Sequence, residues 1–214
     1  MGRNLRLPRL YAIVDAGIFA AEKDAALAVA RFAEELLAGG ATLIQYRNKT
    51  GNGPQMLSQA RELRRVVPRD GVVLIMNDRA DLCLAAGFDG VHVGQDDLSP
   101  AGARMVVGKE RVLGLSTHHP EQLAAAEQTD IDYVAIGPVF ATSTKENPGP
   151  LVGLEGVRRA RAATRKPLVA IGGITRAKCR AVLEAGADCV AVVSDLRENP
   201  RAATEEFLRI LGRS

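Results

Sequence analysis

The sequence predicts an α/β fold, a single (β/α)8 barrel of the TIM type that takes in residues 1–214. Eight short apolar runs alternate with eight amphipathic stretches of helical length, which is the order of elements in such a barrel. The apolar runs are unbroken, as is typical of strands buried on both faces of a parallel sheet. Segments 38–42, 86–90 and 185–189 place glycine between a helix and the next strand, where a left-handed helix cap is needed. A doubly wound open sheet is the alternative fold.

The elements follow one another without a linker or a low-complexity segment, so one domain is expected. Each predicted strand is a short apolar run, and each predicted helix follows a polar or glycine-rich turn. The strands are predicted at 10–14, 42–46, 72–76, 90–93, 112–115, 133–136, 168–171 and 189–193. The helices are predicted at 24–38, 55–67, 79–86, 100–107, 121–128, 154–163, 176–185 and 201–211.

The composition limits the kind of ligand site. Hydrophobic residues make up 47% of the chain and aromatic residues 4%, with no Trp, so the predicted core is aliphatic. A site that stacks its ligand between many aromatic rings is therefore not expected. The net charge of +3 is mildly basic, and no block of Lys and Arg indicates a nucleic-acid partner. This small surplus suits a few anionic groups on small-molecule substrates.

The cysteines and the N-terminal segment indicate the compartment. Cys83, Cys179 and Cys189 are odd in number and lack a CxxC spacing, which is typical of reduced, buried cysteines. The apolar run at 10–14 is too short for a signal peptide, and no run reaches membrane-spanning length. We therefore expect a cytoplasmic protein with no membrane partner. A homo-oligomer stays open.

Active sites of TIM barrels lie at the C-terminal ends of the strands, and polar residues gather there in this sequence. Gln45, Arg47 and Lys49 alternate at the end of the second strand, so their side chains are expected on one side. An Arg and a Lys two residues apart suit a phosphate or a diphosphate. A basic strand end in solvent is the alternative.

Carboxylates follow the next two strands. Asn77 and Asp78 come after the third strand, and Asp97 comes after the fourth. Two carboxylates on adjacent strands can share Mg2+, which also takes water and substrate phosphate oxygens as ligands. Either Asp alone could cap a helix or begin a turn instead. The basic residues on the second strand favour a magnesium–diphosphate site, and whether Asp96 assists Asp97 stays open.

Ser116 ends the fifth strand, where its hydroxyl could donate a hydrogen bond to a leaving phosphate. His118 and His119 follow in a loop, and a structural or exposed role is expected for both. His92 lies inside the fourth strand and is expected to be a core histidine with satisfied hydrogen bonds. No nucleophilic triad is expected.

The connection 137–150 is the longest predicted loop between a strand and its helix. Thr142, Ser143 and Thr144, followed by Lys145, suit an anion clamp, and the glycines and prolines nearby suit a mobile lid. A flexible exposed loop is the alternative, although so long a polar connection in a compact barrel is usually functional.

A second anion site is expected at the last two strands. Gly172 and Gly173 follow the seventh strand, and Ser194 follows the eighth. Backbone N–H groups of these two loops form a recurrent phosphate site in barrels, and glycine permits close approach of the backbone. A tight turn would need the same glycines. Two anion-binding regions indicate two phosphorylated substrates.

The residues at these strand ends resemble the motifs of the thiamin phosphate synthase family. The resemblance runs in order from about residue 10 to about residue 195. The matching segments are Gln45-Tyr-Arg-Asn-Lys49, Met76-Asn-Asp-Arg79, Val91-His-Val-Gly-Gln-Asp-Asp-Leu98, Gly114-Leu-Ser-Thr-His118, Gly137-Pro-Val-Phe-Ala-Thr-Ser-Thr-Lys145, Ile171-Gly-Gly-Ile-Thr175 and Ala185-Gly-Ala-Asp188.

This resemblance implies a transferase that joins 4-amino-2-methyl-5-(diphosphooxymethyl)pyrimidine to 4-methyl-5-(2-phosphooxyethyl)thiazole. The products would be thiamin monophosphate and diphosphate, formed by a Mg2+-assisted dissociative displacement. The resemblance implies Asp78 and Asp97 as Mg2+ ligands. It implies that the pyrimidine diphosphate is bound by Gln45, Arg47, Lys49, Asn77, Ser116 and Lys145, and the thiazole phosphate by Thr142, Ser143, Thr144, Gly173, Val193 and Ser194.

Among these residues, Arg47, Lys49, Ser116 and Lys145 are implied to be catalytic because they would stabilise the departing diphosphate. Tyr46 and Asn48 complete the predicted substrate-binding set. Asn48 departs from the acidic residue more common in the family, and Ala141 departs from the more common proline. Little effect is expected from Asn48, and a slightly looser lid from Ala141.

Two other functions stay open on the same fold. A TenI-type thiazole tautomerase would share the thiazole phosphate site and use His118 or His119 as a base, with less need of a magnesium diphosphate site. A non-catalytic barrel that binds thiamin precursors would need no turnover. A sugar-phosphate isomerase would require a catalytic Lys or Glu inside a strand, and none occurs in the eight runs.

Overall fold

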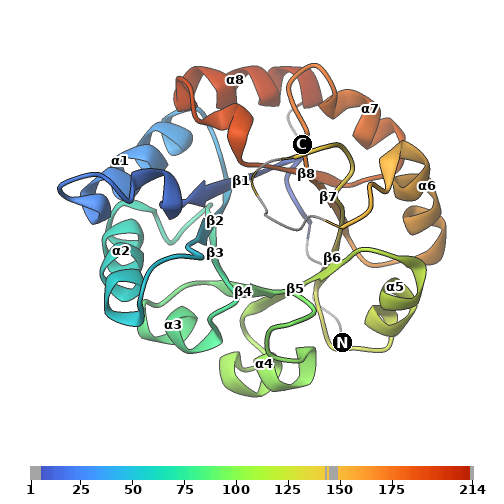
Figure 1. The fold of residues 1–214 in the computed structure, drawn as a ribbon, viewed down its shortest axis with the longest axis horizontal. Coiled ribbons are helices and arrows are strands. Elements are labelled where there is room, and N and C mark those ends of the chain that lie inside the picture. Colours follow the sequence, from blue (N-terminus) through green and yellow to red (C-terminus); the bar gives the residue numbers. More distant parts are fainter. Residues whose placement is uncertain (1–5, 143, 145–148, 213–214) are drawn as a thin grey trace.

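The computed structural model describes residues 6–142, 144 and 149–212. Eight parallel strands pair in chain order, and the last strand pairs with the first, so the sheet closes into a barrel. The helices form a ring outside this barrel (Figure 1). The predicted (β/α)8 class is confirmed, and the open-sheet alternative is excluded.

The elements begin and end close to the predicted bounds. The strands are β1 (Leu10–Asp15), β2 (Leu43–Arg47), β3 (Val73–Asn77), β4 (Gly90–Val93), β5 (Val112–Thr117), β6 (Tyr133–Ile136), β7 (Leu168–Ile171) and β8 (Cys189–Val192). The helices are α1 (Ala25–Ala38), α2 (Gly53–Val66), α3 (Ala80–Ala85), α4 (Pro100–Val107), α5 (Pro120–Glu127), α6 (Gly153–Ala163), α7 (Cys179–Glu184) and α8 (Pro200–Leu211). Two short 3-10 helices, η1 (Ala16–Phe19) and η2 (Ser194–Leu196), were not predicted.

Helix starts follow from local side-chain chemistry. Asp24, Asn52 and Ser99 precede α1, α2 and α4, and each side chain accepts a hydrogen bond from a backbone N–H in the first turn. Such caps satisfy donors that a helix leaves unpaired at its N-terminus. Proline stands in the first turn of α2, α4, α5 and α8, where its missing N–H costs nothing.

Alternation along each strand separates two hydrophobic cores. Ile44 and Tyr46 on β2 point outward and pack in the layer between the strands and the helices. Leu43 on the same strand points inward and packs with Tyr11 and Tyr133 inside the barrel. Side chains two residues apart share a face. Gln45 and Arg47 therefore continue the inward face of β2 toward its C-terminal end.

The N-terminal end of the barrel is held by a recurring polar contact. Asp132, just before β6, accepts hydrogen bonds from Leu113 N (2.7 Å) and from Arg104 of α4 (2.9 Å). Asp89 before β4 and Asp188 before β8 repeat this arrangement with Arg64 of α2 and Arg161 of α6. Each carboxylate thus ties a helix to the starts of two strands.

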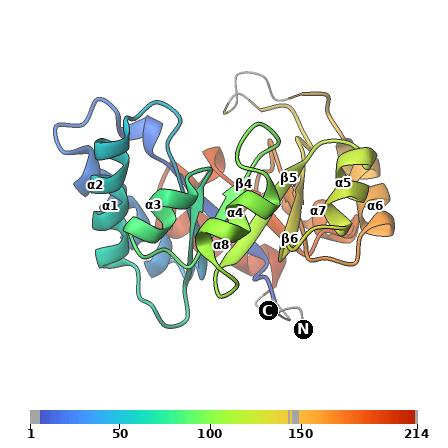
Figure 2. The same cartoon turned by 90° about the horizontal axis from the view of Figure 1, so that it is seen from below.

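The other end of the barrel carries the longer connections. The described part of the connection from β6 to α6 stands on that end of the barrel (Figure 2). Val139 N donates to Ile171 O and Phe140 N to Gly172 O, both at 2.9 Å, so this segment runs beside the end of β7. None of the helices in the described part of the chain has the length and apolar character that crossing a bilayer requires.

Candidate active site

Inward-facing residues at the C-terminal ends of the strands form the floor of the barrel mouth. Gln45 and Arg47 come from β2, Asn77 from β3 and Ser116 from β5. All four are among the residues predicted for the pyrimidine diphosphate. The barrel closure brings them together because the carboxyl ends of parallel strands meet at one end.

Arg47 is held by a carboxylate on the neighbouring strand. Its Nη1 lies 2.6 Å from Oδ2 of Asp15, the last residue of β1, and the two residues pair in the sheet register. Their side chains are 18% and 12% exposed, so the pair is largely removed from water. Asp15 Oδ1 also accepts the N–H of Gly17 at the start of η1. The guanidinium is therefore oriented before any ligand arrives.

Lys49 and Asp78 form a second ion pair, with Nζ 2.5 Å from Oδ2. Asp78 adopts a left-handed backbone conformation (φ 63°), which is uncommon outside glycine. Its N–H donates to His92 O across to β4 (2.8 Å). The N-cap position of α3 is occupied by Arg79, and no side chain accepts a hydrogen bond from the first turn of that helix. The capping alternative for Asp78 is therefore wrong.

Asp97 approaches Asp78 from the loop after β4 and accepts the N–H of Gly94 at 2.7 Å. Burial and the side-chain contact with Asp97 raise the pKa of Asp78 to about 6. Asp96 is exposed. Two carboxylates this close repel one another when both are ionised, and a cation between them would remove that cost.

The donor set fits Mg2+. In the described part of the chain no group of three or more His, Cys, Asp or Glu gathers as a metal cluster. Magnesium, however, is usually held by one or two carboxylates together with water and substrate phosphates. Asn77, one position before Asp78, has its Nδ2 buried with no hydrogen-bond partner in the described part of the chain. A buried donor of this kind is costly unless a ligand oxygen accepts from it.

Ser116 is joined to a buried histidine. Its Oγ lies 2.8 Å from His92 Nε2, and His92 Nδ1 lies 2.9 Å from the hydroxyl of Tyr133. Burial lowers the pKa of His92 to about 4, so the ring is neutral at physiological pH. His92 is therefore the satisfied core histidine that was predicted.

The neutral side of the mouth is lined by backbone. Gly172 (φ 104°) and Gly173 (φ 61°) turn the chain after β7. A Cβ on Gly173 would lie 2.3 Å from Ala141 O, so only glycine fits beside the β6–α6 segment. Within the described residues the Gly173 N–H has no acceptor. Val193 is half-buried and directly follows β8, and the exposed Ser194 begins η2.

Several predicted residues lie elsewhere or outside the described residues. Tyr46 and Asn48 face α2, where Tyr46 Oη and Asn48 Nδ2 both donate to Gln59 Oε1 (2.6 and 2.9 Å). These two side chains lie behind β2, and we leave them out of the proposed site. Thr142 and Thr144 lie on the segment after β6, joined by a Thr144 N to Thr142 Oγ1 contact. Ser143 and Lys145 lie outside the described residues.

The loop histidines are placed differently from one another. His118 Nδ1 donates to Gly137 O at 2.6 Å, which anchors its ring between β5 and β6. His119 is exposed and pairs with Glu121 at 3.0 Å. A structural role for the first and an exposed position for the second agree with the interpretation of the sequence.

Three residues of the mouth and its floor were missed from the sequence. Asp15 ends the first apolar run, so the rule that polar strand ends face the mouth could have found it. Tyr11 and Tyr133 stand within apolar runs, and strict alternation would have placed both inside the barrel. Nothing in the sequence pairs them with Gln45 and His92, because those contacts join different strands.

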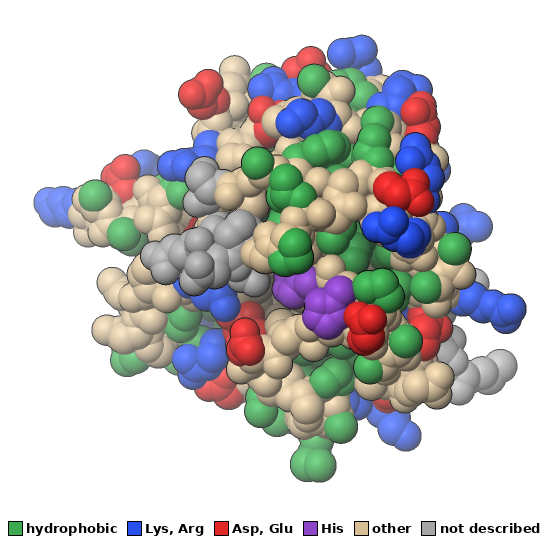
Figure 3. Space-filling view, turned by 45° about the vertical axis from the view of Figure 1, so that its right-hand side comes forward, with side chains coloured by type: hydrophobic (Ala, Val, Ile, Leu, Met, Phe, Trp, Pro, Cys, Tyr) green, Lys and Arg blue, Asp and Glu red, His purple; other side chains and the backbone are tan. Residues whose placement is uncertain are grey.

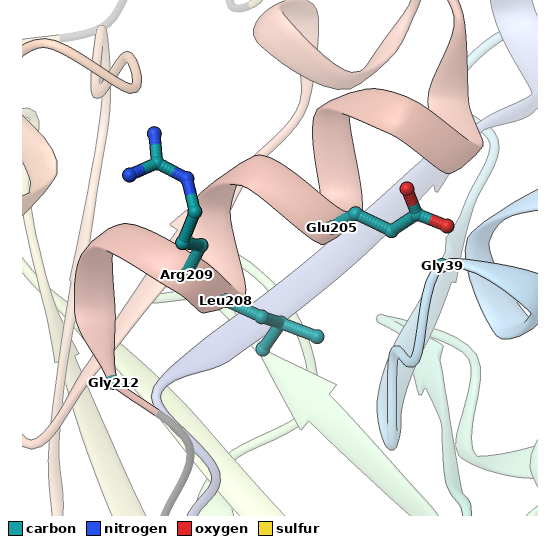
Figure 4. A pocket seen from close by; sticks show the side chains of 5 residues that line it. All are labelled: Gly39, Glu205, Leu208, Arg209 and Gly212. Carbon is teal, nitrogen blue, oxygen red and sulfur yellow. The ribbon is translucent and has the colours of Figure 1, made fainter.

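Away from the barrel mouth, the described residues show mixed surface charge (Figure 3) and a hollow at the other end of the barrel. Basic and acidic side chains are interspersed over the face drawn in Figure 3, without a broad basic patch on it. A hollow of about 370 Å³ is lined by Gly39, Glu205, Leu208, Arg209 and Gly212 (Figure 4). Gly39 and Gly212 follow the C-termini of α1 and α8, so this hollow lies at the end of the barrel opposite the mouth.

Comparison with known sequences shows the family to which the chain belongs. Residues 10–196 match the family described as thiamine monophosphate synthase. The chain is 60% identical over 211 residues to the thiamine-phosphate synthase of Koribacter versatilis, covering 99% of both chains. It is 44% identical over 186 residues to that of Chloroflexus aurantiacus, covering 87% of this chain and 83% of the relative.

Comparison with solved structures agrees. The thiamine phosphate pyrophosphorylase of Pyrococcus furiosus superposes with a TM-score of 0.82 at 32% identity, and the match covers 95% of each chain. The (S)-3-O-geranylgeranylglyceryl phosphate synthase of Thermoplasma acidophilum superposes with a TM-score of 0.67 at 15% identity, which shows the shared fold alone.

Proposed function

Since the chain belongs to the thiamine monophosphate synthase family, we propose that it joins an aminopyrimidine diphosphate to a thiazole phosphate. Its relatives identify it as a transferase of the thiamine-phosphate synthase kind. The bond between the pyrimidine methylene carbon and the diphosphate oxygen breaks, and a bond from that carbon to the thiazole nitrogen forms. The products are thiamin monophosphate and diphosphate.

One observation carries this proposal. Two separately positioned cations, Arg47 paired with Asp15 and Lys49 paired with Asp78, stand on one side of the mouth beside Asp97. Gly173, whose N–H has no acceptor among the residues that the structure describes, stands on the other side. A charged region with two carboxylates suits a diphosphate, and a neutral backbone site suits a monophosphate.

The protein residues stabilise charge on the leaving group. Arg47 and Lys49 donate to diphosphate oxygens, and Asn77 Nδ2 supplies a donor that no other described residue engages. The Ser116 hydroxyl donates a hydrogen bond to the same diphosphate. Lys145 and Ser143 belong to the proposed site by the family resemblance, with Thr142 and Thr144 on the same segment. None of these residues needs to act as a nucleophile, because the thiazole nitrogen is the attacking group.

Asp78 and Asp97 would hold the Mg2+ that neutralises part of the diphosphate charge. On the opposite side, Gly173, Val193 and Ser194 bind the thiazole phosphate and so set the position of the attacking nitrogen. Holding both substrates in one mouth raises the chance of their reaction over capture of the pyrimidine by water. The proposal includes a cytoplasmic location and leaves a homo-oligomer open.

The test is conversion of the two purified substrates to thiamin phosphate, with Mg2+ or with EDTA, by the wild type and by Asp78→Ala. Magnesium-dependent product that is largely lost in the variant supports both the reaction and the metal site. If neither EDTA nor the substitution changes product formation, the proposed metal site is contradicted while the proposed reaction is supported.

The same substrates separate the alternatives. No product from the wild type would contradict the synthase proposal, and isomerisation of the thiazole would then be assayed for a tautomerase. Binding of either substrate without any turnover would instead indicate a precursor-binding barrel.

A further inference from the structure

A chain of hydrogen bonds crosses the interior of the barrel and ends on two residues of the proposed site. Gln45 Nε2 donates to the Tyr11 hydroxyl (2.8 Å), and that hydroxyl lies 3.1 Å from the hydroxyl of Tyr133. Tyr133 Oη lies 2.9 Å from His92 Nδ1, and His92 Nε2 lies 2.8 Å from Ser116 Oγ. The five side chains come from β2, β1, β6, β4 and β5, so this hydrogen-bonded chain joins residues that lie far apart in the sequence.

The interior of this hydrogen-bonded chain is buried, and its side chains are uncharged. Tyr11 and Tyr133 are 1% and 0% exposed, and burial raises the pKa of each well above its ordinary value. Both phenols therefore keep their protons. In such a setting each hydroxyl and each ring nitrogen must find a partner within the chain, because water does not supply one.

The direction of donation is fixed at one end. Tyr11 accepts from the Gln45 amide, so the Tyr11 proton is free to go to Tyr133. Tyr133 then donates to His92 Nδ1, which leaves the single imidazole proton on Nε2. His92 Nε2–H donates to Ser116 Oγ, and Ser116 keeps its own proton for another acceptor.

Glycine makes room for this arrangement. A Cβ on Gly114, the inward residue before Ser116 on β5, would lie 2.1 Å from Tyr133 Cζ and 2.5 Å from His92 Nδ1. No other side chain fits there without moving both rings. The two rings stack with centroids 5.5 Å apart directly against that glycine. The tyrosine–histidine contact thus depends on glycine at position 114.

We propose that Tyr11, Tyr133 and His92 are positioning residues that orient the Ser116 hydroxyl, so that it accepts from His92 and donates into the barrel mouth. This inference rests on the proposed function only for the acceptor, a phosphate oxygen of the leaving diphosphate. Among the described residues the Ser116 hydroxyl has no partner besides His92, and Ser116 is partly exposed at the mouth. If Ser116 instead donated its proton to His92, only oxygen lone pairs would face the barrel mouth, and these would repel an anion.

The first measurement is the tautomer of His92 in the protein without substrates. Long-range 1H–15N correlation spectra separate a protonated Nε2 from a protonated Nδ1, and the chain has only three histidines to assign. We expect the proton on Nε2. A proton on Nδ1, or on both nitrogens, would overturn the inference whatever the enzyme turns over.

The second measurement is a double-mutant cycle on turnover. Tyr133→Phe removes one hydroxyl from the chain, and we expect kcat to fall by about 10-fold with little change in either KM. Ser116→Ala should lower kcat by at least as much. The double variant should be no slower than Ser116→Ala alone, because the tyrosine acts only through the serine.

Thr117→Val is the matched control. Thr117 lies next to Ser116 on the outward face of β5, where its fully buried hydroxyl donates to Ala135 O at 2.9 Å. This substitution also removes one buried hydroxyl, and we expect kcat to be unchanged. Losses that multiply in the double variant, or an equal loss in Thr117→Val, would show a merely structural role and overturn the inference. Absence of wild-type turnover would contradict the proposed function and leave the tautomer result standing.

Discussion

Asp78 is ionised with difficulty in the absence of a cation. Its carboxylate is largely buried, it contacts Asp97, and the ion pair with Lys49 does not offset these costs, so its pKa rises from 3.8 to about 6. The folded protein therefore binds a proton at Asp78 more tightly than the unfolded chain does. The contribution of Asp78 to stability falls as the pH rises through this interval and stays unfavourable above about pH 6.

Asp78→Asn should therefore stabilise the protein without metal and substrate while abolishing metal-dependent turnover. Asparagine cannot ionise, and it tolerates the left-handed backbone at this position. At pH 7 we expect a gain of about 1 to 3 kcal/mol in the free energy of unfolding. Denaturant unfolding at pH 7 and pH 5 measures it. The gain should shrink at the lower pH, and a gain that is equal at both would contradict the assignment.

Asp15 matters through Arg47. In Asp15→Asn the guanidinium loses the charge that orients it, and we expect kcat/KM for the pyrimidine diphosphate to fall by about 10-fold. Steady-state kinetics at saturating thiazole phosphate measures this loss. Glu62→Gln is the control, because it removes an exposed ion pair with Arg65 on α2. Equal activity of both variants would show that Arg47 does not need its partner.

At the scale of elements, the turn after β7 and the segment after β6 depend on each other. Phe140 N donates to Gly172 O, and a Cβ at Gly173 would meet the backbone of Ala141 and the side chain of Phe140. The position of the proposed thiazole phosphate site therefore depends on two connections rather than on one loop. A change in either should disturb both.

Gly173→Ala tests this dependence. The substitution adds a Cβ at a positive φ and forces the β6–α6 segment to move, so we expect turnover to fall by at least about 10-fold. Gly71→Ala is the matched control, since Gly71 also has a positive φ (79°) but has nothing within 4 Å of an added Cβ. The control should lose only the roughly 1 kcal/mol that left-handed backbone costs. Assays with both substrates, beside thermal unfolding, separate the two effects.

At the scale of the whole molecule, the two ends of the barrel have different roles. One end gathers the site, and the other is held by Asp89, Asp132 and Asp188, each bonded to an arginine of a preceding helix and to a strand N–H. Polar contacts at the N-terminal end of a barrel are expected to serve stability. The chemistry and the closure of the fold can therefore change independently.

Asp132→Asn should lower stability without changing turnover by the folded enzyme. Asp132 and Arg104 are 12% and 11% exposed, so the substitution removes the buried charge partner of a largely buried guanidinium and leaves only the exposed Asp130. We expect a loss of about 3 kcal/mol in the free energy of unfolding. Asp130→Asn is the control, because Asp130 contacts the same arginine at 3.4 Å but is 76% exposed. A similar loss in both variants would contradict the importance of burial.

The sequence alone predicted the barrel and most of the strand ends. Unbroken apolar runs, glycine after helices and amphipathic spacing are local signals, and each strand was located to within about one or two residues of its observed bounds. The two 3-10 helices were missed, because three or four residues carry no periodicity. The alternation that places Gln45 and Arg47 on one face of β2 was also readable from the sequence.

Only the tertiary structure decided which of these residues act together. Barrel closure places Asp15 against Arg47 and joins Tyr11, Tyr133 and His92 between two site residues, although Tyr11 and Tyr133 are 122 positions apart in the sequence. It also turns Tyr46 and Asn48 toward Gln59 of α2 and away from the mouth. Local pattern determines which way a side chain leaves its strand. What it meets depends on which strands become neighbours, and that is fixed only when the sheet closes.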